Sequence, residues 1–148
     1  MHRSQTGSSA ATQFALIARA AIEKQFPAAR TAAAEWRLTP GHVWVSWPRA
    51  DGLIQAVGAR RHLDWVTGEA ALMRAAGDPD ALPGWTGDEV PAGAHGGYRV
   101  RLGDLLGDGD RWWPSGEGPR ELAQRLEWIV IQLMVKMDAH FSRHPLPD

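Results

Sequence analysis

The chain has 148 residues, of which sixteen are basic and seventeen are acidic, and it contains no cysteine. The lack of cysteine excludes disulfides, thiolate catalysis and cysteine-ligated zinc. The formal net charge of −1 argues against a nucleic-acid partner, because proteins that bind nucleic acids neutralise phosphates with a concentrated positive surface.

The two ends of the chain are polar or interrupted by proline. Residues 1–8 are small and polar, lack the apolar core of a secretory signal, and are expected to be disordered. Apolar runs such as Trp128–Ile131 are far shorter than the roughly 20 residues that cross a bilayer. We therefore expect a cytoplasmic protein with no membrane partner, consisting of one domain over residues 9–144 and a tail over 145–148.

The first predicted element is an amphipathic helix over residues 9–26. Its apolar residues recur at helical spacing, Ser8 or Ser9 is available as the N-cap, and Pro27 ends the run. The helical face consists of Phe14, Ile17, Ala21, Ile22 and Phe26.

The next region changes to a period of two and predicts strands. Val43, Val45 and Trp47 alternate with His42, Trp44 and Ser46. Further strand-like segments cover 53–60, 65–72 and 98–102, and a short one precedes the turn at 39–42. The short gaps between strands predict antiparallel hairpins.

A long loop and a second helix complete the chain. Residues 74–97 are rich in glycine and proline and predict a loop, and loops of this length are often functional. From Pro119 the apolar residues recur at steps of three and four until Pro145, which predicts a long amphipathic helix. Together the elements predict a two-layer α+β domain, with an antiparallel meander of four to five strands covered by an N-terminal and a long C-terminal helix.

Three polar groupings are candidates for chemistry. His140 and His144 have the four-residue spacing of a helical metal pair, but the preferred interpretation is an ordinary helix end, so no metal is predicted. Asp104, Asp108 and Asp110 lack the ligand order of a calcium loop and fit a turn. His62, Asp64 and Glu69 form a possible acid–base group, although a solvated strand face is the favoured interpretation.

Motifs for nucleotides and acyl transfer are missing. The glycine-rich segment 103–109 has no Gly-Lys-Ser/Thr, and the chain contains no Gly-x-Ser-x-Gly. No cofactor is therefore predicted.

Tryptophan and arginine are the best candidates for partner contact, because these residue types dominate protein-binding hot spots. An exposed patch on the open sheet face is one possibility, and burial of its tryptophans by the long loop or the first helix is the other. The predicted contact residues are Trp44, Arg60, Trp85, Arg99 and Trp112.

The segments Arg101-Leu-Gly-Asp-Leu-Leu106 and Asp110-Arg-Trp-Trp113, set between a strand meander and a closing helix, carry a family resemblance. This order resembles the DUF4304-like proteins, a bacterial family of domains of unknown function. The resemblance implies an α+β domain of bacterial origin without an assigned activity. Small bacterial domains of this kind are also similar in style to immunity proteins of interbacterial toxin systems.

Three hypotheses for function follow. The first is a non-enzymatic module that binds a protein, such as a toxin, and acts as an immunity or regulatory protein. The second is a small enzyme or ligand-binding domain with a pocket under the 74–97 loop, where His62, Asp64, Glu69, His95 and Asp110 would converge. The third is a homodimer that pairs through an exposed strand edge or the last helix.

Overall fold

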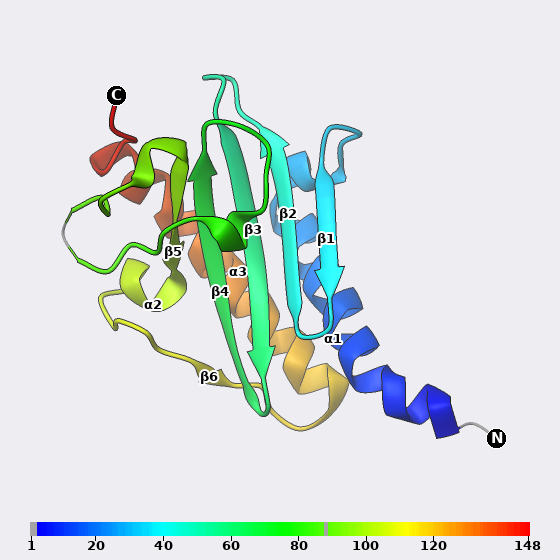
Figure 1. Cartoon of the computed structure of the whole chain (residues 1–148). Helices are drawn as coiled ribbons and strands as arrows, with labels where there is room; N and C mark the ends of the chain where they lie inside the picture. Colours follow the sequence, from blue (N-terminus) through cyan, green and yellow to red (C-terminus); the bar gives the residue numbers. More distant parts are fainter. Residues whose placement is uncertain (1–2, 88) are drawn as a thin grey trace.

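The computed structural model describes residues 3–87 and 89–148, with side chains from residue 12 onward. An antiparallel sheet forms one layer and two long helices form the other, which confirms the predicted α+β class (Figure 1). The five main strands follow each other in chain order: β1 (Glu35–Thr39), β2 (His42–Pro48), β3 (Ile54–His62), β4 (Trp65–Met73) and β5 (Gly97–Arg101). A short strand, β6 (Trp113–Pro114), pairs with the start of β4.

The alternation of side chains along the strands sets which face of the sheet is buried by the helices. Val43 and Val45 of β2 point to the helix face, and Trp44 between them points to the opposite face, which we call the open face. The β1–β2 turn uses Gly41 at φ +75°, a conformation that favours glycine. Tight hairpins of this kind keep consecutive strands adjacent, as the sequence predicts.

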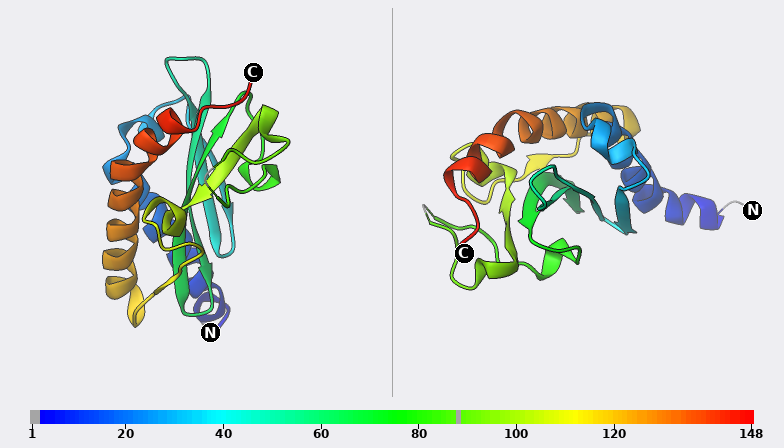
Figure 2. Two further views of the ribbon diagram at one scale, coloured as in Figure 1. Left: turned by 90° about the vertical axis from the view of Figure 1, so that its left-hand side faces the viewer. Right: turned by 90° about the horizontal axis from the view of Figure 1, so that it is seen from above.

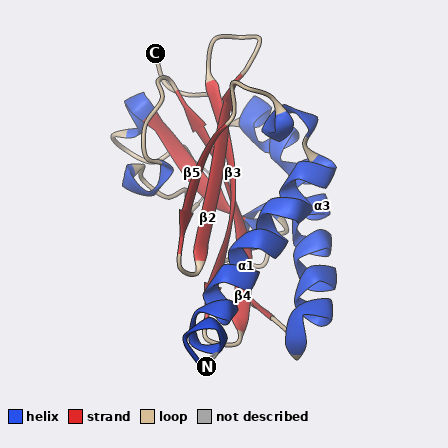
Figure 3. Cartoon of the chain, turned by 90° about the vertical axis from the view of Figure 1, so that its right-hand side faces the viewer, coloured by secondary structure: helices blue, strands red, loops and turns tan. Residues whose placement is uncertain are grey.

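The two helices pack against each other on the helix face of the sheet (Figure 3). Helix α1 spans Arg3–Gln25 and therefore begins before the predicted start at residue 9. Residues 3–8, which we expected to be disordered, belong to this helix, and they contain no proline that would interrupt it. Residues 1 and 2 of that predicted segment lie outside the described residues.

Helix α3 spans Gly118–Arg143, as its periodicity predicts. Its apolar stripe is buried against the sheet and α1, and an ion pair of 3.2 Å between Lys24 and Glu127 links the two helices at their surface. The buried stripe consists of Leu122, Leu126, Ile129, Val130, Leu133, Met137 and Phe141. None of the described helices is both long and apolar enough to cross a membrane.

The chain between β4 and β5 crosses the open face of the sheet, opposite the helices (Figure 2). It contains two 3-10 turns, η2 (Pro79–Ala81) and η3 (Ala94–Gly96). Next to β5 the Trp85 amide donates to the Arg99 carbonyl at 2.7 Å, and the Arg99 amide donates to the Pro83 carbonyl at 3.0 Å. The described part of the predicted loop is thus attached to the sheet by backbone hydrogen bonds.

A second, small apolar cluster lies between this segment and the open face. Leu82 packs there against a cluster that includes Trp44, which is only 3% exposed. The cluster is completed by Ile54, Ala56, Ala71 and Met73. Leu82 and its neighbours therefore shield this part of the open face from solvent.

After β5 the chain forms the single helical turn α2 (Leu102–Leu105) and then reaches β6. In this extended segment Trp113 enters the core at 5% exposure, while Trp112 is half-buried on the other side. The prediction that the two adjacent tryptophans point in opposite directions is confirmed.

Candidate functional site

The open face holds a fully buried carboxylate at its centre. The Glu69 side chain on β4 is 1% exposed, although its strand segment was expected to be solvated. That expectation is wrong because the 74–97 segment lies over this part of the sheet. A buried charge is costly unless it is paired, so its partners define the site.

Side chains of β2 and β3 provide the shortest contacts to Glu69. Arg60 Nε on β3 donates to Glu69 Oε1 at 2.8 Å, and Arg60 Nη2 donates to Oε2 at 3.4 Å. His42 Nε2 on β2 lies 3.4 Å from Glu69 Oε2. Because β2, β3 and β4 are neighbours, the hairpins place these side chains together on one face.

The fourth member comes from the segment that covers the sheet. Asp80 in η2 accepts from Arg60 Nη2 at 2.7 Å, and its other oxygen lies 3.0 Å from His42 Nδ1. The 3-10 turn is itself capped by Asp78, whose side chain accepts from the Asp80 amide at 3.0 Å. The ion-pair network of His42, Arg60, Glu69 and Asp80 therefore connects η2 to the sheet.

The pKa of Glu69 depends on two opposing effects, burial and contact with neighbouring positive groups. Burial by itself raises the pKa, but the contacts of His42 and Arg60 and the charge of Arg60 outweigh burial and lower the pKa to about 2. Glu69 is thus ionised at neutral pH. A carboxylate in that state holds Arg60 in place and has no proton to donate as a general acid.

The same network brings together potential metal ligands. Ligand atoms of His42, Glu69 and Asp80 lie within 4.8 Å of one another. Arg60 Nη2 lies among them, at 2.7 Å from Asp80 Oδ1, 3.1 Å from His42 Nε2 and 3.4 Å from Glu69 Oε2. A guanidinium nitrogen occupies the position that a metal ion would need, so the residues in this arrangement fit an ion-pair network better than a metal site.

A pocket of about 570 Å³ borders the network on the β5 side. Arg101 joins the two, because its Nε lies 3.8 Å from Glu69 Oε1 and its Nη1 donates to Asp110 at 2.6 Å. The Arg101 guanidinium also lies 5.4 Å from the ring centre of Trp112, within the range of a cation–π contact. The pocket is lined by Gly84, Trp85, Thr86, Arg99, Arg101, Asp104, Gly109 and Asp110.

The charged side chains of this pocket differ in their ionic partners. Burial, together with repulsion from Asp110, raises the pKa of Asp104. Arg99 donates from Nε to the Leu82 carbonyl at 3.1 Å but forms no ion pair with a described residue. The pocket therefore presents a guanidinium that has no carboxylate partner among the described residues and could pair with an anionic group.

The five predicted contact residues differ in their burial and in the groups that they contact. Arg60 belongs to the ion-pair network, and Arg99 lines the pocket. Trp44 is covered by Leu82, which is the second of the two possibilities for the tryptophans. Trp85 and Trp112 are half-buried and flank the pocket from the long loop and from the segment before β6.

The predicted acid–base group does not assemble. Glu69 pairs with Gly58, four residues along β3 from His62, which is about 13 Å at 3.3 Å per residue. Asp64 lies in the β3–β4 turn and His95 in η3, and both are exposed. Only Glu69 and Asp110 are brought near each other, through Arg101.

The two C-terminal histidines face the long loop. The rings of His140 and His144 have centres 4.7 Å apart, and Trp85 packs edge-on against His140 at 4.6 Å. Burial, followed by the charges of His144 and Arg143, lowers the pKa of His140 to about 4. No third ligand joins the pair among the described residues, where the one three-ligand group is that of His42.

Neither His42 nor Asp80 was predicted from the sequence as a site residue. The period of two places His42 on the same strand face as Trp44, which is a usable signal for it. Asp80 had no such signal, because its place depends on where the 74–97 segment crosses the sheet.

Comparisons with protein-family models, with curated proteins and with solved structures found no match. The resemblance to the DUF4304-like proteins consequently stays an expectation.

Proposed function

We propose that this chain is a non-enzymatic module that binds a protein and serves as an immunity or regulatory protein. Its contact surface would be the rim of the open-face pocket, formed by Trp85, Arg99, Arg101 and Trp112, which we call the arginine–tryptophan rim. Arginine and tryptophan are the residue types that contribute most to protein-binding hot spots. The pairing of Glu69 with Arg60 is consistent with a structural role for this carboxylate beneath the rim.

The observation that carries the proposal is the Arg99 guanidinium, which forms no ion pair with a described residue and lines the pocket together with the half-buried Trp85, while Trp112 stacks on the neighbouring Arg101. A partner that presents a carboxylate could pair with Arg99 while an apolar group packs on Trp112. Arginine suits this role because its planar guanidinium binds carboxylates through two hydrogen bonds. The favoured partner is therefore a protein with an acidic contact surface, and a toxin is one candidate.

The test is affinity capture from the native host followed by measurement with the purified partner. Arg99→Ala should weaken binding at least about tenfold, the usual effect of losing a hot-spot residue. Arg37→Ala is the matched control, since Arg37 is exposed on β1, at the opposite edge of the sheet from β5. Trp44→Ala is unsuitable as a contact probe because Trp44 is buried.

Two results would contradict the proposal. One is a purified partner that binds the Arg99→Ala variant as tightly as the unchanged chain. The other is a partner whose affinity is unaffected by salt, because an arginine–carboxylate contact at a surface weakens as ionic strength rises.

The pocket also favours a second candidate function, a small enzyme or ligand-binding domain. Its volume of about 570 Å³ lies within the roughly 300–1,000 Å³ of small-molecule sites. Arg99 and Asp104 could bind the two ends of a zwitterion such as an amino acid. Calorimetry with a set of free amino acids would support this candidate if binding is saturable and is lost in both Arg99→Ala and Asp104→Asn.

Homodimerisation through the edge strand β1 remains a further proposal. Light scattering over a concentration series tests it, and a constant monomer mass would contradict it.

A further inference from the structure

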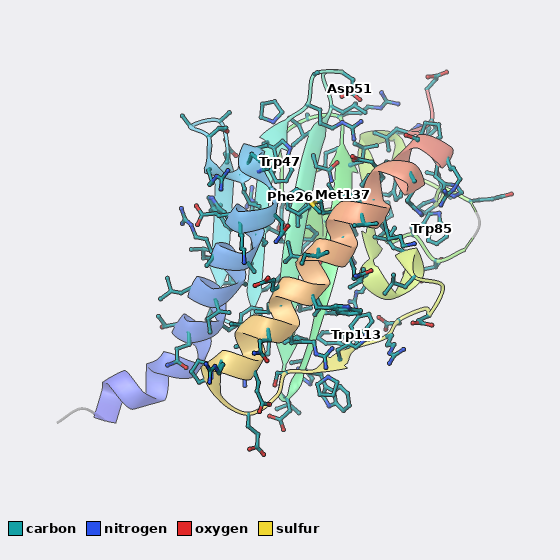
Figure 4. The ribbon with its side chains drawn as sticks, turned by 180° about the vertical axis from the view of Figure 1, so that it is seen from behind. Phe26, Trp47, Asp51, Trp85, Trp113 and Met137 are labelled. Atoms are coloured by element: carbon teal, nitrogen blue, oxygen red, sulfur yellow. The ribbon has the colours of Figure 1, made fainter. Side chains whose placement is uncertain are left out.

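A second pocket lies on the helix face of the sheet, away from the arginine–tryptophan rim. It is formed where the end of α1, the C-terminal half of α3 and the β2–β3 hairpin meet (Figure 4). Its volume is about 640 Å³, again within the range of small-molecule sites. None of its lining residues belongs to the site described above.

One wall of this pocket is aromatic. The rings of Phe26, directly after α1, and Trp47 on β2 have centres 5.6 Å apart and are tilted by 40°. Both side chains are buried except for the parts that line the pocket. Aromatic faces are electron-rich and attract cations, tryptophan most strongly.

Helix α3 supplies a second wall that combines sulfur and a carboxylate. Met134, Asp138 and Ser142 follow one another at four-residue steps and so lie on one face of the helix. Met137 lies deeper and approaches the buried Gln55 amide at 3.7 Å. Methionine thioethers are polarisable and adapt to apolar ligands of different shape.

The charges around the pocket favour a cationic ligand. Arg49, the one basic residue of the lining, is held by Asp51 at 3.0 Å and by Gln55 at 3.3 Å. Asp138 is exposed and has no ion pair with any described residue. The lining therefore keeps one uncompensated negative charge next to an aromatic wall.

We propose that this pocket binds a small organic cation that carries an apolar or aromatic body. The cationic group lies between Trp47 and Asp138, and the apolar body packs on Phe26 and the two methionines. An anion finds no free positive group here, and a strongly polar ligand leaves the aromatic wall unused. The site is independent of the proposed protein-binding function, because the two lie on opposite faces of the sheet.

The four methionines of the chain provide the readout. Benzyltrimethylammonium is titrated into protein labelled with ¹³C at the methionine methyl groups. The Met134 and Met137 signals should shift saturably, whereas Met73, which packs on the open face, should not move. Benzyl alcohol and phenylacetate, the neutral and anionic probes, should bind at least about tenfold more weakly, because they lack the cation–π and carboxylate contacts.

Two variants test the roles of individual groups. Asp138→Asn should weaken binding of benzyltrimethylammonium by about twofold to fivefold, as expected for one exposed charge pair. Phe26→Leu keeps an apolar wall but removes the aromatic face, and should weaken binding further while circular dichroism confirms the fold. Asp64→Asn, on an exposed turn, is the control and should leave the affinity unchanged.

Three outcomes would overturn the proposal. They are shifts of Met73 equal to those of Met134 and Met137, equal affinity for benzyl alcohol and benzyltrimethylammonium, and unchanged affinity in Asp138→Asn.

Discussion

A single buried carboxylate organises the open face at the scale of residues. Glu69 is contacted by side chains from three strands, His42 of β2, Arg60 of β3 and Arg101 of β5, and its pKa of about 2 shows that favourable contacts outweigh the cost of burial. Buried ion pairs add little net stability but are costly to break, since one partner is left as an unpaired charge.

The first prediction concerns the ion pair between Glu69 and Arg60. Glu69→Gln should lower the free energy of unfolding by roughly 1.5–3 kcal/mol, because Arg60 and His42 lose the charged acceptor that they share, while Arg60 keeps its pair with Asp80. Chemical denaturation at neutral pH measures the change. Glu35→Gln on the exposed strand β1 should cost less than about 0.5 kcal/mol, and an equal loss in the two variants would contradict the role given to Glu69.

The second prediction concerns His140. Its pKa of about 4 in the folded chain lies below the ordinary value of 6.5. The unfolded chain therefore binds this proton first, and the free energy of unfolding should fall as the pH drops from about 6.5 to about 4. His140 accounts for on the order of 3 kcal/mol of this loss, at 1.36 kcal/mol per pKa unit.

The check is a set of denaturation curves across that pH range. His140→Leu should flatten the dependence, whereas His62→Leu, at an exposed position, should leave it as it is. A slope that is the same in all three proteins would show that His140 is not the titrating group.

At the scale of elements, the 74–97 segment is the part whose position matters most for the site. It is attached by the Asp80 ion pairs, by Leu82 in the small apolar cluster and by backbone hydrogen bonds to β5. Loops that are held at a few points open locally at a lower free energy than the core.

The third prediction tests this attachment. Asp80→Ala removes the charged contacts to Arg60 and His42 and should speed hydrogen exchange of the Trp85 amide by about fivefold to tenfold, equal to a loss of about 1 kcal/mol of local stability. The result is read against the amides of α3, which should not change. Glu89→Ala in the same loop is the control, and equal acceleration in both variants would contradict the prediction.

The fourth prediction concerns the turn between α2 and β6, which borders the pocket. A Cβ at Gly103 would lie 1.9 Å from the Gly109 carbonyl oxygen and 2.8 Å from the Arg111 amide nitrogen. Gly103→Ala should therefore destabilise the fold by about 3 kcal/mol, since backbone atoms would have to move. Thermal unfolding of both variants measures the effect. Gly77→Ala, where a Cβ meets nothing within 4 Å, should be close to neutral.

At the scale of the whole molecule, one apolar core joins the two layers. It includes residues of α1, β2, β4 and α3, so neither layer buries its apolar surface alone. Such a domain is expected to unfold in one cooperative transition.

The fifth prediction follows from this shared core. Tryptophan fluorescence and far-ultraviolet circular dichroism should report the same denaturation midpoint, although the tryptophans other than Trp128 report on the sheet and its connections and the dichroism reports mainly on the two helices. Separate midpoints would show that one layer, or α1 alone, unfolds independently.

The amino-acid sequence by itself determined the elements and their order. The period of two at Val43, Val45 and Trp47 and the helical period from Leu122 to Phe141 depend on neighbours in the chain, so they predict strands and a helix correctly. The start of α1 was missed because small polar residues carry no apolar period.

Only the tertiary structure decided the site. Asp80 follows Glu69 by eleven residues in the chain. No local sequence pattern indicates that η2 lies on the open face. Burial of Glu69 and Trp44 depends on that crossing, as does the pocket beside Arg99. Interactions between distant segments depend on packing, which a pattern of neighbouring residues does not record.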